Sequence, residues 1–69
     1  MVTINQIREK LIEAIEQSGL SQAKIAEKLH IRQQTVSDYI NGKSMPALDT
    51  LANLCVALDL DANDILCIR

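Results

Sequence analysis

The stretch that most constrains the fold of this chain is residues 21 to 43, SQAKIAEKLHIRQQTVSDYINGK. Its apolar residues recur at spacings that place them on one side of two short helices bent around a tight turn. Two crossing helices of this kind can share one small core, whose expected members are Ile25, Ala26, Leu29, Ile31, Val36 and Tyr39. The stretch therefore predicts a helical pair whose second helix exposes a polar face.

That polar face is built from hydrogen-bonding side chains of moderate length. At about 100° per residue, Val36 and Tyr39 mark the inward side of the second helix. The opposite arc holds Gln33, Gln34, Ser37, Asp38 and Asn41. Amide side chains can donate to and accept from base edges in the major groove of B-DNA. Taken alone such an arc is ordinarily a solvated helix surface, but within this motif it favours DNA binding.

Length and composition indicate one small all-α domain. The chain has 69 residues, of which 48% are hydrophobic and 1% aromatic, so the core must be aliphatic. One Pro and two Gly leave little turn chemistry for hairpins, and period-2 alternation is absent. No apolar run approaches the roughly 18 residues of a membrane span, and Met1 is not followed by a signal-like segment. We therefore expect a cytoplasmic protein.

Catalysis, metal binding and cofactor binding find no support in the residue pattern. There is a single His, and neither a phosphate-cradling glycine loop nor a nucleophile elbow is present. Two cysteines, Cys55 and Cys67, lack histidines at zinc-ligand spacing. Cys55 lies in the apolar run LANLCVAL, where a thiol usually packs as a small hydrophobe. We expect no enzyme, no metal and no cofactor.

Charge is polarised along the chain although its total is −2. In residues 21 to 43, four cations (Lys24, Lys28, Arg32, Lys43) against two acids give +2. Residues 1 to 20 sum to −1 and residues 44 to 69 to −3. Screening over about 8 to 10 Å lets the local positive patch act partly independently of the acidic end. The acidic total therefore does not exclude a polyanionic partner.

Capping residues and helix-ending residues in the sequence predict five helices. The first covers about 3 to 18, with Thr3 and Gln6 in capping-box register, and Gly19 ends it. Ser21 caps a helix that ends near 29; the next runs from about 33 to 40 and stops at Asn41-Gly42. A fourth helix covers about 48 to 58, and a short fifth follows residue 61. The stripes expected to be buried are Ile4, Ile7, Leu11, Ile12 and Ile15 in the first helix, and Leu48, Leu51, Leu54, Cys55 and Leu58 in the fourth.

Four segments together resemble the Cro/C1-type helix-turn-helix family of phage and bacterial transcriptional regulators. They are SGLSQAKIAEKL, QQTVSDYINGK, MPALDTLANLCVALDL and ANDIL, and the match covers about residues 4 to 66. The resemblance implies one compact five-helix, lambda-repressor-like domain over residues 1 to 69. It also implies a third helix that enters the major groove of double-stranded DNA, and a homodimer on an approximately two-fold symmetric operator.

The resemblance assigns roles to individual positions. Gln22 matches the glutamine that anchors a phosphate at the start of the second helix. Gln33 and Gln34 match the positions that reach base edges, with Ser37 and Asp38 one turn further along the same face. Arg32, just before that helix, receives no role from the resemblance; a cation there opposes the helix dipole, a cost that a nearby phosphate contact could offset. The loop that grips the backbone corresponds to Asn41, Gly42 and Lys43.

Several residues depart from the family pattern and keep a second reading open. His30 stands where Gly is common, Ala47 where a hydroxyl cap is usual, and Ile40 where Glu is frequent. Arg32 replaces a Ser or Thr cap, and the Asp38 carboxylate would repel phosphates although it could accept from cytosine N4. These departures and the acidic total suit the alternative of a protein-interaction or antitoxin-like module with weak operator binding. Ile68 is the best candidate for an interface residue of the dimer, and a frayed chain end is the alternative interpretation of this position.

Overall fold

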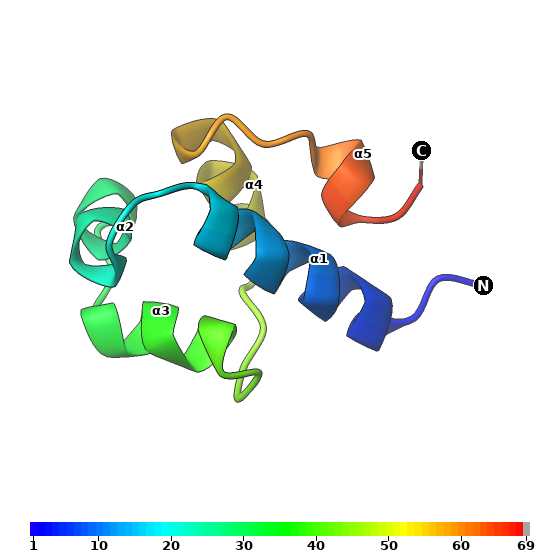
Figure 1. The fold of residues 1–69 in the computed structure, drawn as a ribbon, viewed down its shortest axis with the longest axis horizontal. Coiled ribbons are helices and arrows are strands. Elements are labelled where there is room, and N and C mark those ends of the chain that lie inside the picture. The colour runs from blue at the N-terminus through cyan, green and yellow to red at the C-terminus, as the bar shows by residue number, and fades with distance from the viewer. Residues whose placement is uncertain (69) are drawn as a thin grey trace.

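The structure, a computed structural model, describes residues 1–68 and confirms the predicted all-α architecture. Within these residues there is no strand, and no helix is long and apolar enough to cross a membrane. Figure 1 shows α1 crossing the middle of the molecule, with α2 and α3 at one end and α5 against the other half of α1. The helices are α1 (Ile4–Gln17), α2 (Gln22–Leu29), α3 (Gln33–Ile40), α4 (Leu48–Ala57) and α5 (Ala62–Ile65).

Side-chain caps fix the starts of three helices where the sequence predicts them. The Thr3 hydroxyl accepts a hydrogen bond from the Gln6 amide at 3.3 Å, and the Gln6 side chain accepts from the Thr3 amide at 2.9 Å. This reciprocal pair is the predicted capping box. Ser21 caps α2 through the Lys24 amide and Asp61 caps α5 through the Asn63 amide.

Each helix is followed, within two residues of its end, by a residue with left-handed backbone angles. In four of the helices, the residue after the left-handed one donates its amide to a carbonyl five positions earlier, the bond that closes a Schellman motif. Two of the five left-handed residues are glycines, and the other three are L-residues in a conformation that their Cβ disfavours. The residues are Gly19, His30, Gly42, Asp59 and Cys67, with φ of 76°, 55°, 74°, 54° and 59°.

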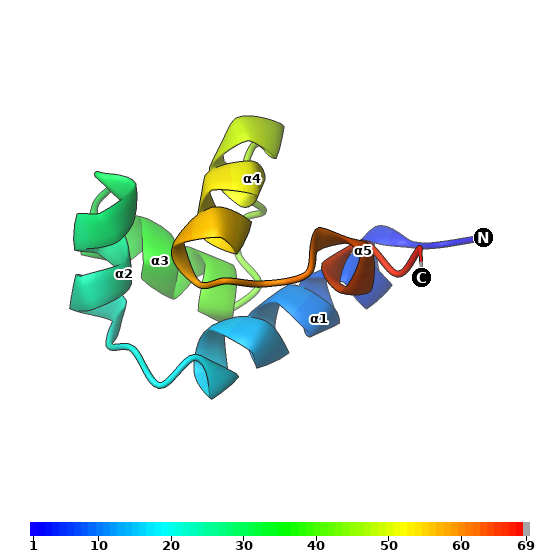
Figure 2. The same ribbon diagram turned by 90° about the horizontal axis from the view of Figure 1, so that it is seen from above.

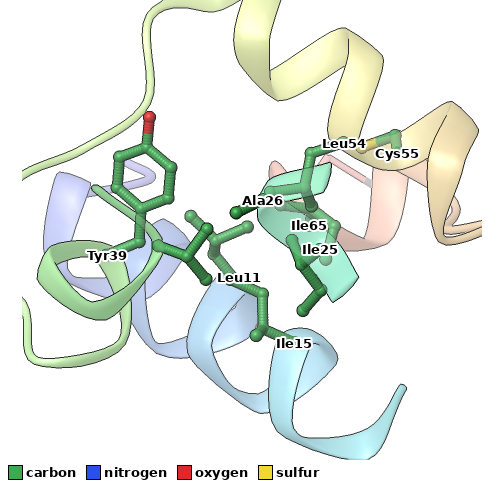
Figure 3. Packing of buried hydrophobic residues seen from close by; sticks show 9 residues of the cluster. Leu11, Ile15, Ile25, Ala26, Tyr39, Leu54, Cys55 and Ile65 are labelled. Carbon is green, nitrogen blue, oxygen red and sulfur yellow. The ribbon is translucent and has the colours of Figure 1, made fainter. Parts of the chain in front are cut away.

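A single aliphatic cluster joins all five helices. Figure 3 shows side chains of the helices converging on a small volume, with the Tyr39 ring at one margin and its hydroxyl pointing away from the cluster. This arrangement confirms the buried pair expected in the third helix. The buried residues are Leu11, Ile15, Ile25, Ala26, Val36, Tyr39, Leu54, Cys55 and Ile65.

Two residues assigned to the buried stripes are exposed, so those two predictions are wrong. Ile4 is 55% exposed and Leu48 is 85% exposed. Each is the first residue of its helix, beyond the part covered by neighbouring elements. Figure 2 shows the N-terminal end of α4 extending away from the other helices. Periodicity identifies the side of a helix that packs, but it does not show how far along the helix its neighbours reach.

The two cysteines are free thiols in different surroundings. Cys55 is buried in the cluster, and burial raises the pKa of its thiol. This surrounding fits the small hydrophobe expected from the sequence. Cys67 is half-buried at the end of α5, where its thiol lies 3.8 Å from the Ile65 carbonyl oxygen.

Candidate nucleic-acid interface

α3 is held in place by its inward face. Val36 has no exposed surface and Tyr39 is 6% exposed, so the helix is anchored at two positions one turn apart. α3 packs mainly on α2 and also touches α1, as Figure 1 shows from the side. With that face fixed, Gln33 and Gln34 are exposed, while Ser37 and Asp38 are half-buried on the outward side. A rigid helix of about 12 Å thus presents the predicted polar residues together.

Hydrogen bonds between successive turns organise this polar face. The Gln34 side-chain amide donates to the Asp38 carboxylate at 3.0 Å, and the Asn41 amide donates to the Ser37 hydroxyl at 3.3 Å. Both pairs have the i,i+4 spacing that brings side chains together on a helix. Gln33 has no side-chain hydrogen bond to any of residues 1–68. Gln33 is therefore the amide with complete freedom to meet a base edge.

The Gln34–Asp38 bond changes what both residues can do. One Gln34 amide hydrogen is occupied, while the other hydrogen and the carbonyl oxygen stay available. That hydrogen can still be donated to adenine N7, and the oxygen can accept from adenine N6. The Asp38 carboxylate accepts this hydrogen bond from Gln34, which partly compensates its negative charge. Asp38 thus orients Gln34 as well as carrying its own negative charge toward any DNA.

The turn between α2 and α3 fixes the angle at which the two helices meet. His30 has φ 55° and ψ 42°, the left-handed conformation expected where the family commonly has Gly. The Ile31 amide donates to the Ala26 carbonyl at 3.0 Å, and the His30 amide donates to Glu27 at 3.3 Å. These two bonds satisfy carbonyls at the end of α2. An L-residue therefore supports the turn at the cost of local strain.

Two helix N-termini belong to the helix-turn-helix motif. Gln22 is the first residue of α2 and is half-buried. Arg32 precedes α3 and makes no side-chain cap, so its guanidinium is free to extend into solvent. The first amides of both helices carry partial positive charge, which favours an anion. The predicted phosphate contacts Gln22 and Arg32 thus begin the two helices of the motif.

The loop after α3 offers side chains more readily than backbone amides. The Asn41, Gly42 and Lys43 amides donate to the carbonyls of Ser37, Tyr39 and Asp38, at 2.9, 3.2 and 2.9 Å. A backbone grip on phosphate by these amides, as the resemblance implies, would have to share hydrogens that close the helix end. The side chains of Asn41 and Lys43 are exposed. These side chains are the available phosphate donors of the loop.

The positively charged side chains around the motif differ in whether they form ion pairs. Lys24 lies 3.8 Å from Glu27, an exposed ion pair of small energetic weight. Within residues 1–68, Arg32 and Lys43 have no ion-pair partner. They lie at the two ends of α3, on either side of the polar face. The polar face of α3 therefore has a cation without an ion-pair partner at each of its two ends.

One cation outside the predicted set also reaches this region. Arg8 of α1 lies against Gly42, because a Cβ on Gly42 would be 3.4 Å from the Arg8 Cδ. The sequence motif begins thirteen residues later and carries no signal for this contact. Only the packing of α1 beside the C-terminal end of α3 creates it (Figures 1 and 2).

Hollows that could hold a small molecule lie elsewhere in the described part of the chain. One of about 300 Å³ is lined by residues of α1, the end of α4 and α5. Another of about 210 Å³ lies along α1 beside Cys67. Among residues 1–68, no group of three His, Cys, Asp or Glu side chains is placed to hold a metal ion. None of the residues that line these two hollows belongs to α3.

Comparison with known families agrees with the geometry. The family model described as "Helix-turn-helix" matches residues 11–65, from within α1 to the end of α5. No curated protein and no solved structure matches the chain.

Proposed function

Because this chain belongs to the Cro/C1-type helix-turn-helix family of DNA-binding regulators, we propose that it is a sequence-specific transcriptional repressor. α3 enters the major groove of an operator, Gln33 and Gln34 read base edges, and Ser37 and Asp38 modulate the preference. Gln22, Arg32, Asn41 and Lys43 hold the flanking phosphates. The protein acts in the cytoplasm and needs no cofactor.

One observation carries this proposal: a rigid helix presents exposed amides between two unpaired cations. Val36 and Tyr39 fix the helix, so little freedom is lost when its polar face meets a groove. Arg32 and Lys43 at its two ends supply the non-specific attraction to phosphate. Such an arrangement positions the base-reading groups before binding.

The direct test is selection of bound sequences from a random duplex pool, followed by Gln33→Ala. We expect a defined operator, and a variant with relaxed preference at one base pair, by about 1 to 3 kcal/mol of discrimination. The matched control is Gln17→Ala, an exposed glutamine at the end of α1. No enrichment from the pool would refute operator binding; unchanged preference in Gln33→Ala would remove only that residue from the readout.

We further propose that two copies bind one operator, since a single small module makes few base contacts. Ile68 is 63% exposed, and Val2 and Ile4 are also exposed. Figures 1 and 2 show both termini at the same end of the molecule, so these residues offer an apolar end surface. Its modest size suits a pair that forms on DNA and separates at low concentration.

A protein-interaction or antitoxin-like role is the second candidate function. The observation that favours it is the exposed apolar pair on α4, since Leu48 and Val56 are 85% and 83% exposed. The net charge of −2 also weakens long-range attraction to DNA. A tight complex with another protein, together with no salt-dependent affinity for duplex DNA, would favour this role over the regulator.

A further inference from the structure

The side chain of Arg8 lies against the loop that follows α3. Its Cδ and Nε would lie 3.4 Å and 4.0 Å from a Cβ on Gly42, so the guanidinium end of the side chain rests on the glycine backbone. Gly42 has φ 74° and closes the end of α3. Arg8 therefore contacts the loop that also carries Asn41 and Lys43, whose side chains are exposed.

The guanidinium of Arg8 is only partly satisfied by the protein. Its Nη1 donates to the Asn5 side-chain oxygen at 2.7 Å, one turn earlier on α1. Its Nε is buried and has no hydrogen-bond partner among residues 1–68, so an outside anion can meet only the Nη1 and Nη2 nitrogens. Neither ion pair found in that range includes Arg8, so its positive charge faces no carboxylate there. Arg8 is thus a positioned cation without an anionic partner among residues 1–68, and such a cation can bind an anion.

We propose that Arg8 is a phosphate-contact residue that extends the DNA interface from the helix-turn-helix onto α1. The two terminal nitrogens of a guanidinium, Nη1 and Nη2, match a phosphate with two parallel hydrogen bonds, and the bond from Nη1 to Asn5 holds them in one orientation. The strand gripped by Lys43 passes the same loop, so one backbone phosphate meets a cation from α1 and a cation from the loop after α3. This inference rests on the proposed function of the α3 face.

The test measures duplex affinity against salt concentration, by fluorescence anisotropy with a short duplex of mixed sequence. Arg8→Met keeps the aliphatic stem on Gly42 and removes the charge. The matched control is Lys10→Met, which removes a charge from the same helix where it lies 3.9 Å from Asp64 of α5. We expect the slope of log affinity against log salt to fall in magnitude by about 0.9 for Arg8→Met. We expect an unchanged slope for Lys10→Met.

Arg8→Lys distinguishes a phosphate contact from a packing role. It keeps the charge and should keep the slope, with weaker binding because the fork is lost. Should Arg8→Met fail to give a cooperative melting transition, Arg8→Gln takes its place with the same expected slope. An unchanged slope in the neutral variant, or an equal fall in Lys10→Met, would overturn the inference while leaving the proposed function standing. A wild-type protein with no salt-dependent duplex binding would overturn the proposed function itself.

Discussion

Replacing His30 by glycine should stabilise the protein without altering its DNA face. His30 is an exposed L-residue at φ 55° in the turn that joins α2 to α3. Its side chain makes no hydrogen bond or ion pair with the rest of residues 1–68, so its removal loses no such contact. Glycine adopts the same backbone angles without a Cβ clash. The substitution therefore changes mainly backbone strain and the entropy of the unfolded chain.

The magnitude follows from two opposing terms. A left-handed L-residue costs about 1 to 2 kcal/mol, which the glycine relieves. The extra freedom of glycine in the unfolded chain costs about 0.4 to 1 kcal/mol. His is among the residues better tolerated at positive φ, so the strain that glycine relieves is small. The net gain in stability should therefore lie in the lower half of the difference between the two terms. We expect a net gain of about 0.4 to 0.8 kcal/mol, or about 2 to 6 °C in Tm for a domain of this size.

The assay is thermal unfolding followed by circular dichroism at 222 nm, at fixed protein concentration. His30→Ala is the matched control, because it also removes the imidazole but retains the Cβ. We expect its Tm to lie at or below that of the wild type. Duplex affinity of His30→Gly should stay within error, since the bonds from Ile31 to Ala26 and from His30 to Glu27 are kept. A glycine variant that melts no higher than wild type, or an alanine variant that gains equally, would refute the reasoning.

Lys43→Ala should weaken specific and non-specific binding alike and lower the salt slope by about 0.9, measured by anisotropy; loss confined to one sequence would mean that Lys43 reads bases. Burial, and secondarily the charge of Asp49, raise the pKa of Tyr39 above its ordinary 10.0. The folded state thus favours the neutral phenol, and its contribution to stability is present below pH 10.0 and lost as pH rises through the folded pKa. Spectrophotometric titration of this single tyrosine checks the direction, with Tyr39→Phe showing a smaller alkaline loss. Ile68→Glu should reduce two bound copies per operator to one in analytical ultracentrifugation, whereas Val56→Glu on α4 should leave two; the reverse result would move the dimer surface to α4.

Local signals in the sequence determine most of the secondary structure. Thr3 with Gln6, and Ser21, are capping residues whose hydrogen bonds form within three positions along the chain, so their partners are already fixed by the sequence. The bounds of α3 agree with the prediction for the same reason, since a polar arc and the Asn41-Gly42 stop enclose it. Helix periodicity likewise identified Val36 and Tyr39 as the buried side, and therefore the face that α3 exposes.

Long-range packing decides what these signals leave open. Ile4 and Leu48 have the periodicity of core residues but lie at helix starts that no neighbouring element covers, so only the arrangement of the helices exposes them. Arg8 reaches Gly42 across 34 positions of sequence, and no local pattern encodes such a meeting. Hydrophobic burial is non-directional: it requires that apolar faces meet, while the crossing of the helices determines which polar side chains come together beside them.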